Sequence, residues 1–224
     1  MRIACYHNLP SGGAKRVLYE HTRGLRAAGH EVVVHELQTA DAAFCDVAEV
    51  ADRVVRVPCV WRELPAPRRG PAGVADALLH TGVLYGNYRR LAAVAAGVAG
   101  KLSDEGFDLA YVHHDAFETA PTLLRYARIP TVYFCQEPSR GVFESPLFDE
   151  QGGPAAPASP ASLWRHALGG AASVVRRYRL LNERANTQAA TLVLANSAYS
   201  AESILRAHGR VARLCTLGVD AEFF

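Results

Sequence analysis

Two adjacent glycines, Gly12 and Gly13, stand between a short apolar segment and the start of an amphipathic run. Residues 2–7 favour a strand, and from Ala14 onwards the apolar positions recur with helical spacing. A glycine loop in this place brings backbone N–H groups to a helix N-terminus, where an anion is stabilised. We therefore expect Gly12, Gly13, Ala14 and Lys15 to face a phosphate-bearing ligand, with a plain tight turn as the alternative.

Two histidines, His113 and His114, close another apolar segment. Because the side chains of a strand alternate between its two faces, one ring is expected in the core and the other in a cleft at the end of the strand. The alternation favours His114 for the cleft, where it would hydrogen-bond a ligand. No spacing of Asp, Glu, His or Cys residues supports a metal site.

Gln136 and Glu137 come directly after the apolar residues 131–135 and before a proline. A carboxylate at the end of a strand is a candidate for orienting a hydroxyl group of a substrate. The plainer roles for Glu137 are to cap a neighbouring helix or to pair with Arg140. The position at the end of a strand favours the functional interpretation.

Asn196 and Ser197 occupy the same kind of position, directly after residues 191–195. Their simplest role is to cap a helix that begins near Tyr199, because Asn and Ser side chains accept hydrogen bonds from the first N–H groups of a helix. Their place at the end of a strand makes them candidates for the cleft as well.

Strands and helices are predicted to alternate along the whole chain. The expected strands cover residues 2–7, 31–37, 53–58, 109–113, 131–135, 191–195 and 211–215. The expected helices cover residues 14–28, 73–103, 118–127, 163–188 and 201–208, and residues 139–161 are predicted to form a long mobile loop rich in proline and glycine. This alternation indicates an α/β fold with a parallel sheet covered on both faces. Ligands bind such sheets at the carboxyl ends of the strands, which selects residues 8–15, 113–115, 136–140 and 196–197.

Composition excludes several classes of protein. The chain has 224 residues, half of them hydrophobic, which is enough for one large α/β domain or two small ones. A formal net charge of +2 gives no reason to expect a nucleic-acid partner. Five cysteines without a CxxC pair fit a reducing cytoplasm, and the apolar run 91–100 is too short to span a bilayer.

Several segments, taken in order, resemble the N-terminal half of glycosyltransferase family 4, the retaining enzymes of the GT-B fold. The segments that carry the resemblance are residues 8–16 with 24–34, 108–114, 129–138, 195–197 and 218–220 followed by Phe223 or Phe224. The chain departs from the family at three places. Lys15 stands where an acidic residue is common, Gln136 where His is frequent, and Leu217 where Asn or Pro is frequent.

The resemblance implies a Rossmann-like domain over residues 1–224, with residues 216–224 starting the crossover to a second domain. It implies a nucleotide-sugar donor and a saccharide, lipid-linked or small-molecule acceptor, without a metal or other cofactor. The glycine loop would face the donor diphosphate, and the donor-binding C-terminal domain would lie beyond this chain, which alone would be inactive. The residues assigned on this basis are His114 and Glu137 as catalytic, and His113, Gln136, Arg140, Asn196 and Ser197 as lining the acceptor cleft.

Two other functions remain open at this point. A dinucleotide-binding oxidoreductase would use Glu36 for a ribose, although the loop reads Ser-Gly-Gly-Ala and lacks the Gly-x-Gly-x-x-Gly pattern. A module that binds an acceptor or a partner without catalysis is the third hypothesis. The arginines of residues 163–188 are expected to form a solvated face, or to contact an anionic membrane surface of a cytoplasmic enzyme that acts on lipid-linked acceptors.

Overall fold

The structure is a computed structural model that describes residues 1–64, 68, 71–139, 143 and 160–218. Within these residues the chain forms a seven-stranded sheet in the order β3-β2-β1-β4-β5-β6-β7, and every paired strand is parallel to its neighbour. The strands are β1 (Arg2–Asn8), β2 (Glu31–Leu37), β3 (Arg53–Val57), β4 (Leu109–Asp115), β5 (Thr131–Cys135), β6 (Leu192–Ala195) and β7 (Arg213–Leu214). The predicted α/β, Rossmann-like fold class is therefore confirmed.

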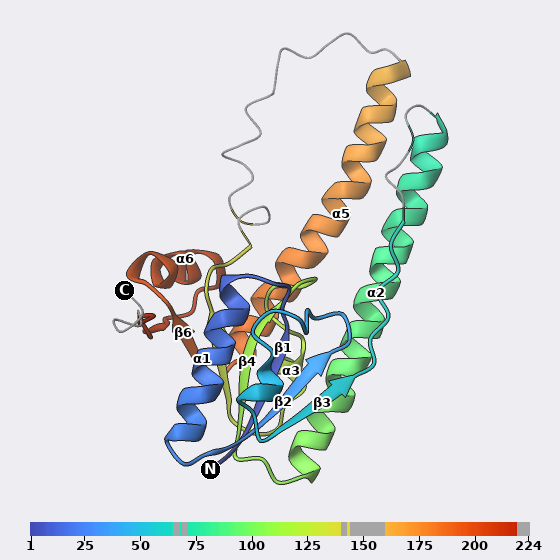
Figure 1. The fold of residues 1–224 in the computed structure, drawn as a ribbon. Coiled ribbons are helices and arrows are strands. Elements are labelled where there is room, and N and C mark those ends of the chain that lie inside the picture. The colour runs from blue at the N-terminus through green and yellow to red at the C-terminus, as the bar shows by residue number, and fades with distance from the viewer. Residues whose placement is uncertain (65–67, 69–70, 140–142, 144–159, 219–224) are drawn as a thin grey trace.

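Helices cover both faces of this sheet (Figure 1). They are α1 (Gly13–Ala27), α2 (Pro71–Asp104), α3 (Leu123–Tyr126), α5 (Pro160–Ala189) and α6 (Ala198–His208), with a 3₁₀ turn η1 (Val47–Glu49). One core cluster holds alternate strand residues such as Ala4 and Tyr6 against α2, α3 and α6, and the other holds Ile3 and Cys5 against α1 and η1. This division follows from the period of two along each strand.

The long helices α2 and α5 lie side by side and extend well beyond the sheet (Figure 1). Their 34 and 30 residues contrast with strands of at most seven. At 1.5 Å per residue, each helix is roughly 45–50 Å long, about twice the length of the longest strand. Neither these nor the other helices of the described chain combine the length and the apolar character that crossing a membrane requires.

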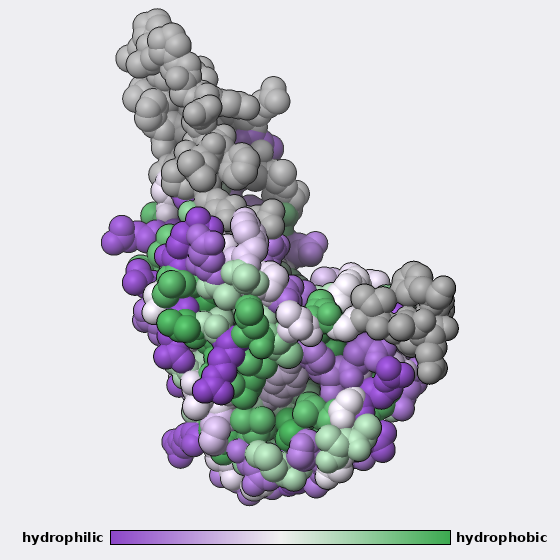
Figure 2. Space-filling view, turned by 90° about the vertical axis from the view of Figure 1, so that its left-hand side faces the viewer, coloured by the Kyte–Doolittle hydropathy of each residue, from purple (hydrophilic) through white to green (hydrophobic). Residues whose placement is uncertain are grey.

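Figure 2 views the molecule from the side on which α1 and α6 lie. Hydrophilic and hydrophobic side chains are interspersed over this face, and neither kind covers it continuously (Figure 2). The hydropathy of this side therefore does not mark a single apolar docking face.

The turn after β4 is where the structure differs most from the sequence prediction. The helix expected over residues 118–127 is reduced to α3, because residues 115–119 close a tight loop in which Asp115 and Thr119 exchange two backbone hydrogen bonds of 3.0 and 3.1 Å. Thr119 has φ +56°, an unusual conformation for a β-branched residue. The loop predicted over residues 139–161 falls largely outside the described residues, and α5 begins earlier than predicted, at Pro160.

Candidate functional site

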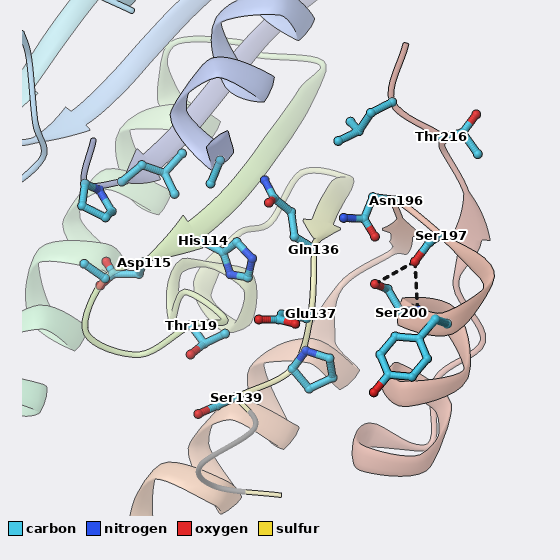
Figure 3. A pocket seen from close by; sticks show the side chains of 17 residues that line it. His114, Asp115, Thr119, Gln136, Glu137, Ser139, Asn196, Ser197, Ser200 and Thr216 are labelled. Atoms are coloured by element: carbon cyan, nitrogen blue, oxygen red, sulfur yellow. Dashed lines mark hydrogen bonds between the residues drawn. The ribbon is translucent and has the colours of Figure 1, made fainter. Parts of the chain in front are cut away.

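A pocket of about 670 Å³ lies at the carboxyl ends of the central strands. The sheet order reverses between β1 and β4, and open α/β sheets bind ligands at the carboxyl edge near such a point. The pocket is lined by residues that follow β1, β4, β5, β6 and β7, together with the first turns of α1 and α6 (Figure 3). The edge of the sheet that the sequence selects is thus the edge that carries this cavity.

His114 projects into this pocket, beside Gln136, Glu137 and Thr119 (Figure 3). Burial lowers the pKa of the ring below its ordinary value, although a hydrogen bond with the backbone of Thr119 and the charge of Glu137 oppose that shift. The imidazole is therefore neutral at pH 7 and offers one donor and one acceptor nitrogen. Strand alternation predicted this placement; the catalytic role stays a prediction.

His113 requires a correction. Its ring is fully buried on the opposite face of β4, packed against His21, Tyr111 and Phe134 at centroid distances of 4.8–5.9 Å. Burial holds its pKa well below the ordinary value. Adjacent residues of a strand face opposite sides, so His113 cannot share the pocket with His114. It is a core residue and not a cleft residue.

The segment after β5 forms another wall of the pocket. Gln136 is partly buried, and the exposed Glu137 also lines the cavity (Figure 3). The segment is tied to α5, because the backbone N–H of Ser139 donates to Glu183 Oε1 at 3.0 Å. Glu183 is buried, and burial raises its pKa to about 7. Arg140, the remaining predicted residue of this segment, lies outside the described residues.

The first turn of α6 forms a further wall of the pocket (Figure 3). Ser197 caps the helix, and its hydroxyl accepts from the backbone N–H of Ser200 at 3.1 Å. Gly209 ends the helix in the left-handed conformation, with φ +67°. The predicted capping role is confirmed for Ser197 and not for Asn196, and both residues line the pocket.

The glycine loop reaches the pocket only in part. Gly12 has φ +141°, which L-amino acids with side chains rarely adopt, and α1 begins at the next residue. Ala14 lines the cavity, whereas Gly12 and Gly13 are exposed and lie outside its lining. The first turn of α1 contains no acidic residue, so the positive end of the helix dipole is not neutralised there. Diphosphate binding by this loop stays a prediction.

Lys15 is the second correction. Its side chain is fully buried, and Nζ lies 3.1 Å from Oε2 of Glu36 on β2. The same carboxylate is 3.4 Å from His7 Nε2 and 3.7 Å from Arg56 Nε. The ammonium is therefore occupied in the interior and does not add charge at a diphosphate. The same burial leaves Glu36 poorly placed for the ribose contact of a dinucleotide enzyme.

Two buried carboxyl groups lie at the pocket: Asp115, which belongs to the residues 113–115 selected from the sequence, and Glu118, which does not. Asp115 Oδ1 accepts from Asn8 Nδ2 at 3.2 Å and from the backbone N–H of Phe117 at 2.8 Å, and burial raises its pKa to about 6. Burial first, and then the charge of Asp115, raise the pKa of Glu118 to about 8. Asp115 stands directly after the two histidines, which was the available signal. No sequence signal pointed to Glu118, because its environment depends on the buried hydrogen-bond partners Thr122 and Asn182.

Metal ligands do not gather in the part of the chain that the structure describes. No group of three or more His, Cys, Asp or Glu side chains there could hold a metal ion. The five cysteines are free thiols, and Cys5, Cys59 and Cys135 are buried. Whether the protein works without a metal stays a prediction.

Comparison with known proteins gives one family and a set of similar solved structures. The family described as "Glycosyl transferase 4-like domain" matches residues 12–219. No curated protein matches the chain.

The solved structures are similar at low sequence identity. A UGT transferase from Siraitia grosvenorii in complex with UDP is 11% identical, with a TM-score of 0.46 over 97% of this chain and 51% of that one. UGT89C1 of Arabidopsis thaliana in complex with UDP-L-rhamnose is 12% identical, with a TM-score of 0.48 over 97% and 51%. The calicheamicin glycosyltransferase CalG4 is 14% identical, with a TM-score of 0.47 over 96% and 52%. The chain thus spans about half the length of these proteins.

Proposed function

Because the chain belongs to the glycosyl transferase 4-like domain family, we propose that it forms one half of a retaining glycosyltransferase. The enzyme transfers a sugar from a nucleotide-sugar donor to a hydroxyl group of a saccharide, lipid-linked or small-molecule acceptor. The observation that supports this most is the pocket at the switch point, where His114, Gln136, Glu137 and Ser197 converge with the first turn of α1 (Figure 3).

The two sides of this pocket differ in charge preference. The first turns of α1 and α6 both face it, and neither contains an acidic residue. Helix N-termini favour negative charge, which suits the diphosphate that leaves during transfer. The side formed by β4 and β5 offers His114 and the carboxylate of Glu137, which suit the hydroxyl group of an acceptor. In this proposal catalysis rests on positioning and on stabilising the leaving diphosphate, without a metal and without a protein nucleophile.

The second half of the active site is proposed to come from a donor-binding domain outside these 224 residues. The support is that the chain spans about half the length of the solved structures to which it is similar. We also retain, as a proposal, a cytoplasmic location with peripheral contact to an anionic membrane. Its support is the set of arginines on α5, of which Arg177 and Arg184 are exposed.

A donor screen tests the proposed activity. The chain is joined to a donor-binding domain and assayed for transfer and hydrolysis with a panel of nucleotide-sugars. We expect turnover with at least one donor. The variant His114→Ala should lower kcat/KM by about 10²–10⁴-fold if the ring takes part in proton transfer, whereas the control Lys101→Ala, at an exposed position of α2 outside the pocket lining, should not. Absence of transfer and hydrolysis with every donor would refute the proposal.

Binding measurements on the 224-residue chain distinguish the other hypotheses. With nucleoside diphosphates we expect weak or undetectable binding, because the proposal assigns most nucleotide contacts to the donor-binding domain; tight binding would contradict a divided site. Micromolar binding of NAD would favour an oxidoreductase. The burial of Glu36 argues against that outcome, because a buried carboxylate is poorly placed to contact a ribose. A joined protein that binds donor and acceptor but never turns over would favour a non-catalytic module.

A further inference from the structure

The turn formed by residues 115–119 shapes one wall of the pocket. Asp115, Ala116 and Thr119 line the cavity, and the ring of His114 is hydrogen-bonded to the backbone of Thr119 (Figure 3). Two backbone hydrogen bonds of 3.0 and 3.1 Å between Asp115 and Thr119 close the turn, and Thr119 takes a φ of +56° in it. A positive φ at a β-branched residue is strained, so the closed turn needs support from its surroundings.

Two carboxyl groups are buried within this turn, and Asp115 and Glu118 are only 3% and 5% exposed. Asp115 Oδ1 accepts from Asn8 Nδ2 at 3.2 Å, whereas Oδ2 is enclosed and meets no hydrogen-bond donor in the described chain. Glu118 Oε2 accepts from Thr122 Oγ1 at 2.6 Å and from Asn182 Nδ2 at 3.2 Å. Among the described residues neither carboxyl group has an ion-pair partner, so both meet neutral donors only.

The neighbouring elements supply little charge to offset an ionised pair. The titratable groups that face the two acids are Tyr6 on β1, Cys59 after β3, Tyr88 on α2, Arg125 on α3, Tyr133 on β5 and Tyr178 on α5. Burial raises the pKa of the phenol and thiol groups, which therefore stay neutral below pH 9. The exposed Arg125 donates to Asn182 Oδ1 at 2.5 Å and not to either carboxyl group. Two negative charges in this place would repel each other with little compensation, which favours retention of a proton.

We propose that the turn 115–119 is a proton-operated wall of the pocket, closed while Asp115 and Glu118 hold a proton between them and open when both are ionised. The proton passes to water, and the two carboxylates gain the hydration that the closed turn denies them. Opening breaks the backbone pair of Asp115 and Thr119 and separates His114 from its backbone partner. This inference does not depend on the proposed function, because it concerns the shape of the pocket and not the ligand.

The pH range of the opening follows from the two acids. Burial raises the pKa of Asp115 to about 6, and burial together with the charge of Asp115 raises that of Glu118 to about 8. In the open turn both groups return to ordinary values near 4, so opening releases protons at pH values between the two sets. For Glu118 the opening constant should rise about tenfold per pH unit above pH 4.5 and level off above pH 8. This amounts to a rise of about 50-fold between pH 6 and 8.

Amide hydrogen exchange, measured by NMR on the 224-residue chain, tests this proposal. The opening constants of the amides of Asp115 and Thr119 are obtained after correction for the intrinsic exchange rate at each pH. We expect the rise of about 50-fold between pH 6 and 8 and a level value from pH 8 to 9. The control is the amide of Ala51, which donates to Val47 O at 2.9 Å in the core cluster on the other face of the sheet and should change less than about twofold.

One variant and one core amide separate the device from a merely structural role. Glu118→Gln keeps the size of the neutral acid and cannot ionise, so the opening constant should change by no more than about threefold between pH 6 and 8, and a rise equal to that of the parent would overturn the proposal. The same holds if the amide of Thr119 exchanges as slowly as that of Ala110 in β4 at every pH, because the turn then opens only on global unfolding.

The parent chain alone decides the matter if the variant does not fold. The ¹³C signal of the Glu118 carboxyl group reports its protonation directly, and we expect a titration midpoint above pH 6. A midpoint below pH 6 would mean that the pair holds no proton at neutral pH, and the proton-operated wall would then be refuted.

Discussion

Replacing Lys15 by methionine should destabilise the fold, because the substitution removes one partner of a buried ion pair. The Nζ–Oε2 distance to Glu36 is 3.1 Å, and the two side chains are 0% and 5% exposed. Methionine keeps the length of the side chain but leaves the carboxylate with His7 at 3.4 Å and the largely exposed Arg56 at 3.7 Å. Breaking a buried pair in this way costs about 3–5 kcal/mol, and the two remaining partners place the expected loss near 3 kcal/mol.

The pH dependence of this loss can be worked out from Glu36. Burial alone would raise its pKa, but hydrogen bonds from His7 and Lys15 outweigh burial and lower the pKa from 4.5 to about 2. A carboxyl group with a lowered pKa stabilises the fold above its unfolded value and loses that contribution as pH falls toward the folded value. At about 1.4 kcal/mol per pKa unit the contribution is about 3 kcal/mol. The gap between parent and variant should therefore be full at pH 7 and shrink between pH 4.5 and 2.

Urea unfolding followed by circular dichroism at pH 7, 5 and 3 measures this gap. The matched control is Arg16→Met, the next residue of α1, which is exposed and should change stability by less than about 0.5 kcal/mol. In a thermal scan at pH 7 the Lys15→Met variant should unfold about 6–12 °C below the parent. Equal stability of the two variants, or a gap that stays constant down to pH 3, would refute the buried pair and restore Lys15 as a candidate for the diphosphate loop.

Three further substitutions test the surroundings of the pocket. The raised pKa of Glu118, about 8, means that its contribution is full below about pH 4.5 and lost as pH rises through 8, so Glu118→Gln should flatten the fall of melting temperature between pH 4.5 and 8; an equally steep fall would contradict this. Ser197→Ala removes the cap of α6 and should cost about 1 kcal/mol in urea unfolding, and no loss would argue against the cap. Thr119→Gly relieves the φ of +56° and should gain up to about 1 kcal/mol, whereas a clear loss would show that the side chain matters more than the strain.

Local patterns explain the elements that could be predicted from the sequence. The second and fifth strands were predicted with their observed bounds, Glu31–Leu37 and Thr131–Cys135, because each is rich in β-branched or aromatic residues. The choice of His114 over His113 needed only the alternation of a strand. These are properties of neighbouring residues, which the sequence displays directly.

What could not be predicted depends on partners that are distant in sequence. The ion pair of Lys15 joins residues 21 positions apart, and no local pattern announces it. The helix expected over residues 118–127 has suitable composition, but the carboxylate of Asp115 binds the backbone of Phe117 and favours a tight loop. The placement of Asp115 and Glu118 among neutral partners is likewise a property of the assembled fold.

The strand order has a consequence for folding kinetics. β1 lies near the middle of the sheet and pairs on one side with β2 and on the other with β4, where Asn8 contacts Asp115 across 107 positions of sequence. Pairings over such separations are slow, because the intervening chain must be ordered before the contacts stabilise it. The pocket draws its walls from residues as far apart as Leu9 and Leu217, so it is completed only when the last strands have docked. A ligand bound there therefore stabilises only the fully folded state of the chain. The amount of ligand bound then reports the fraction of molecules that have finished folding.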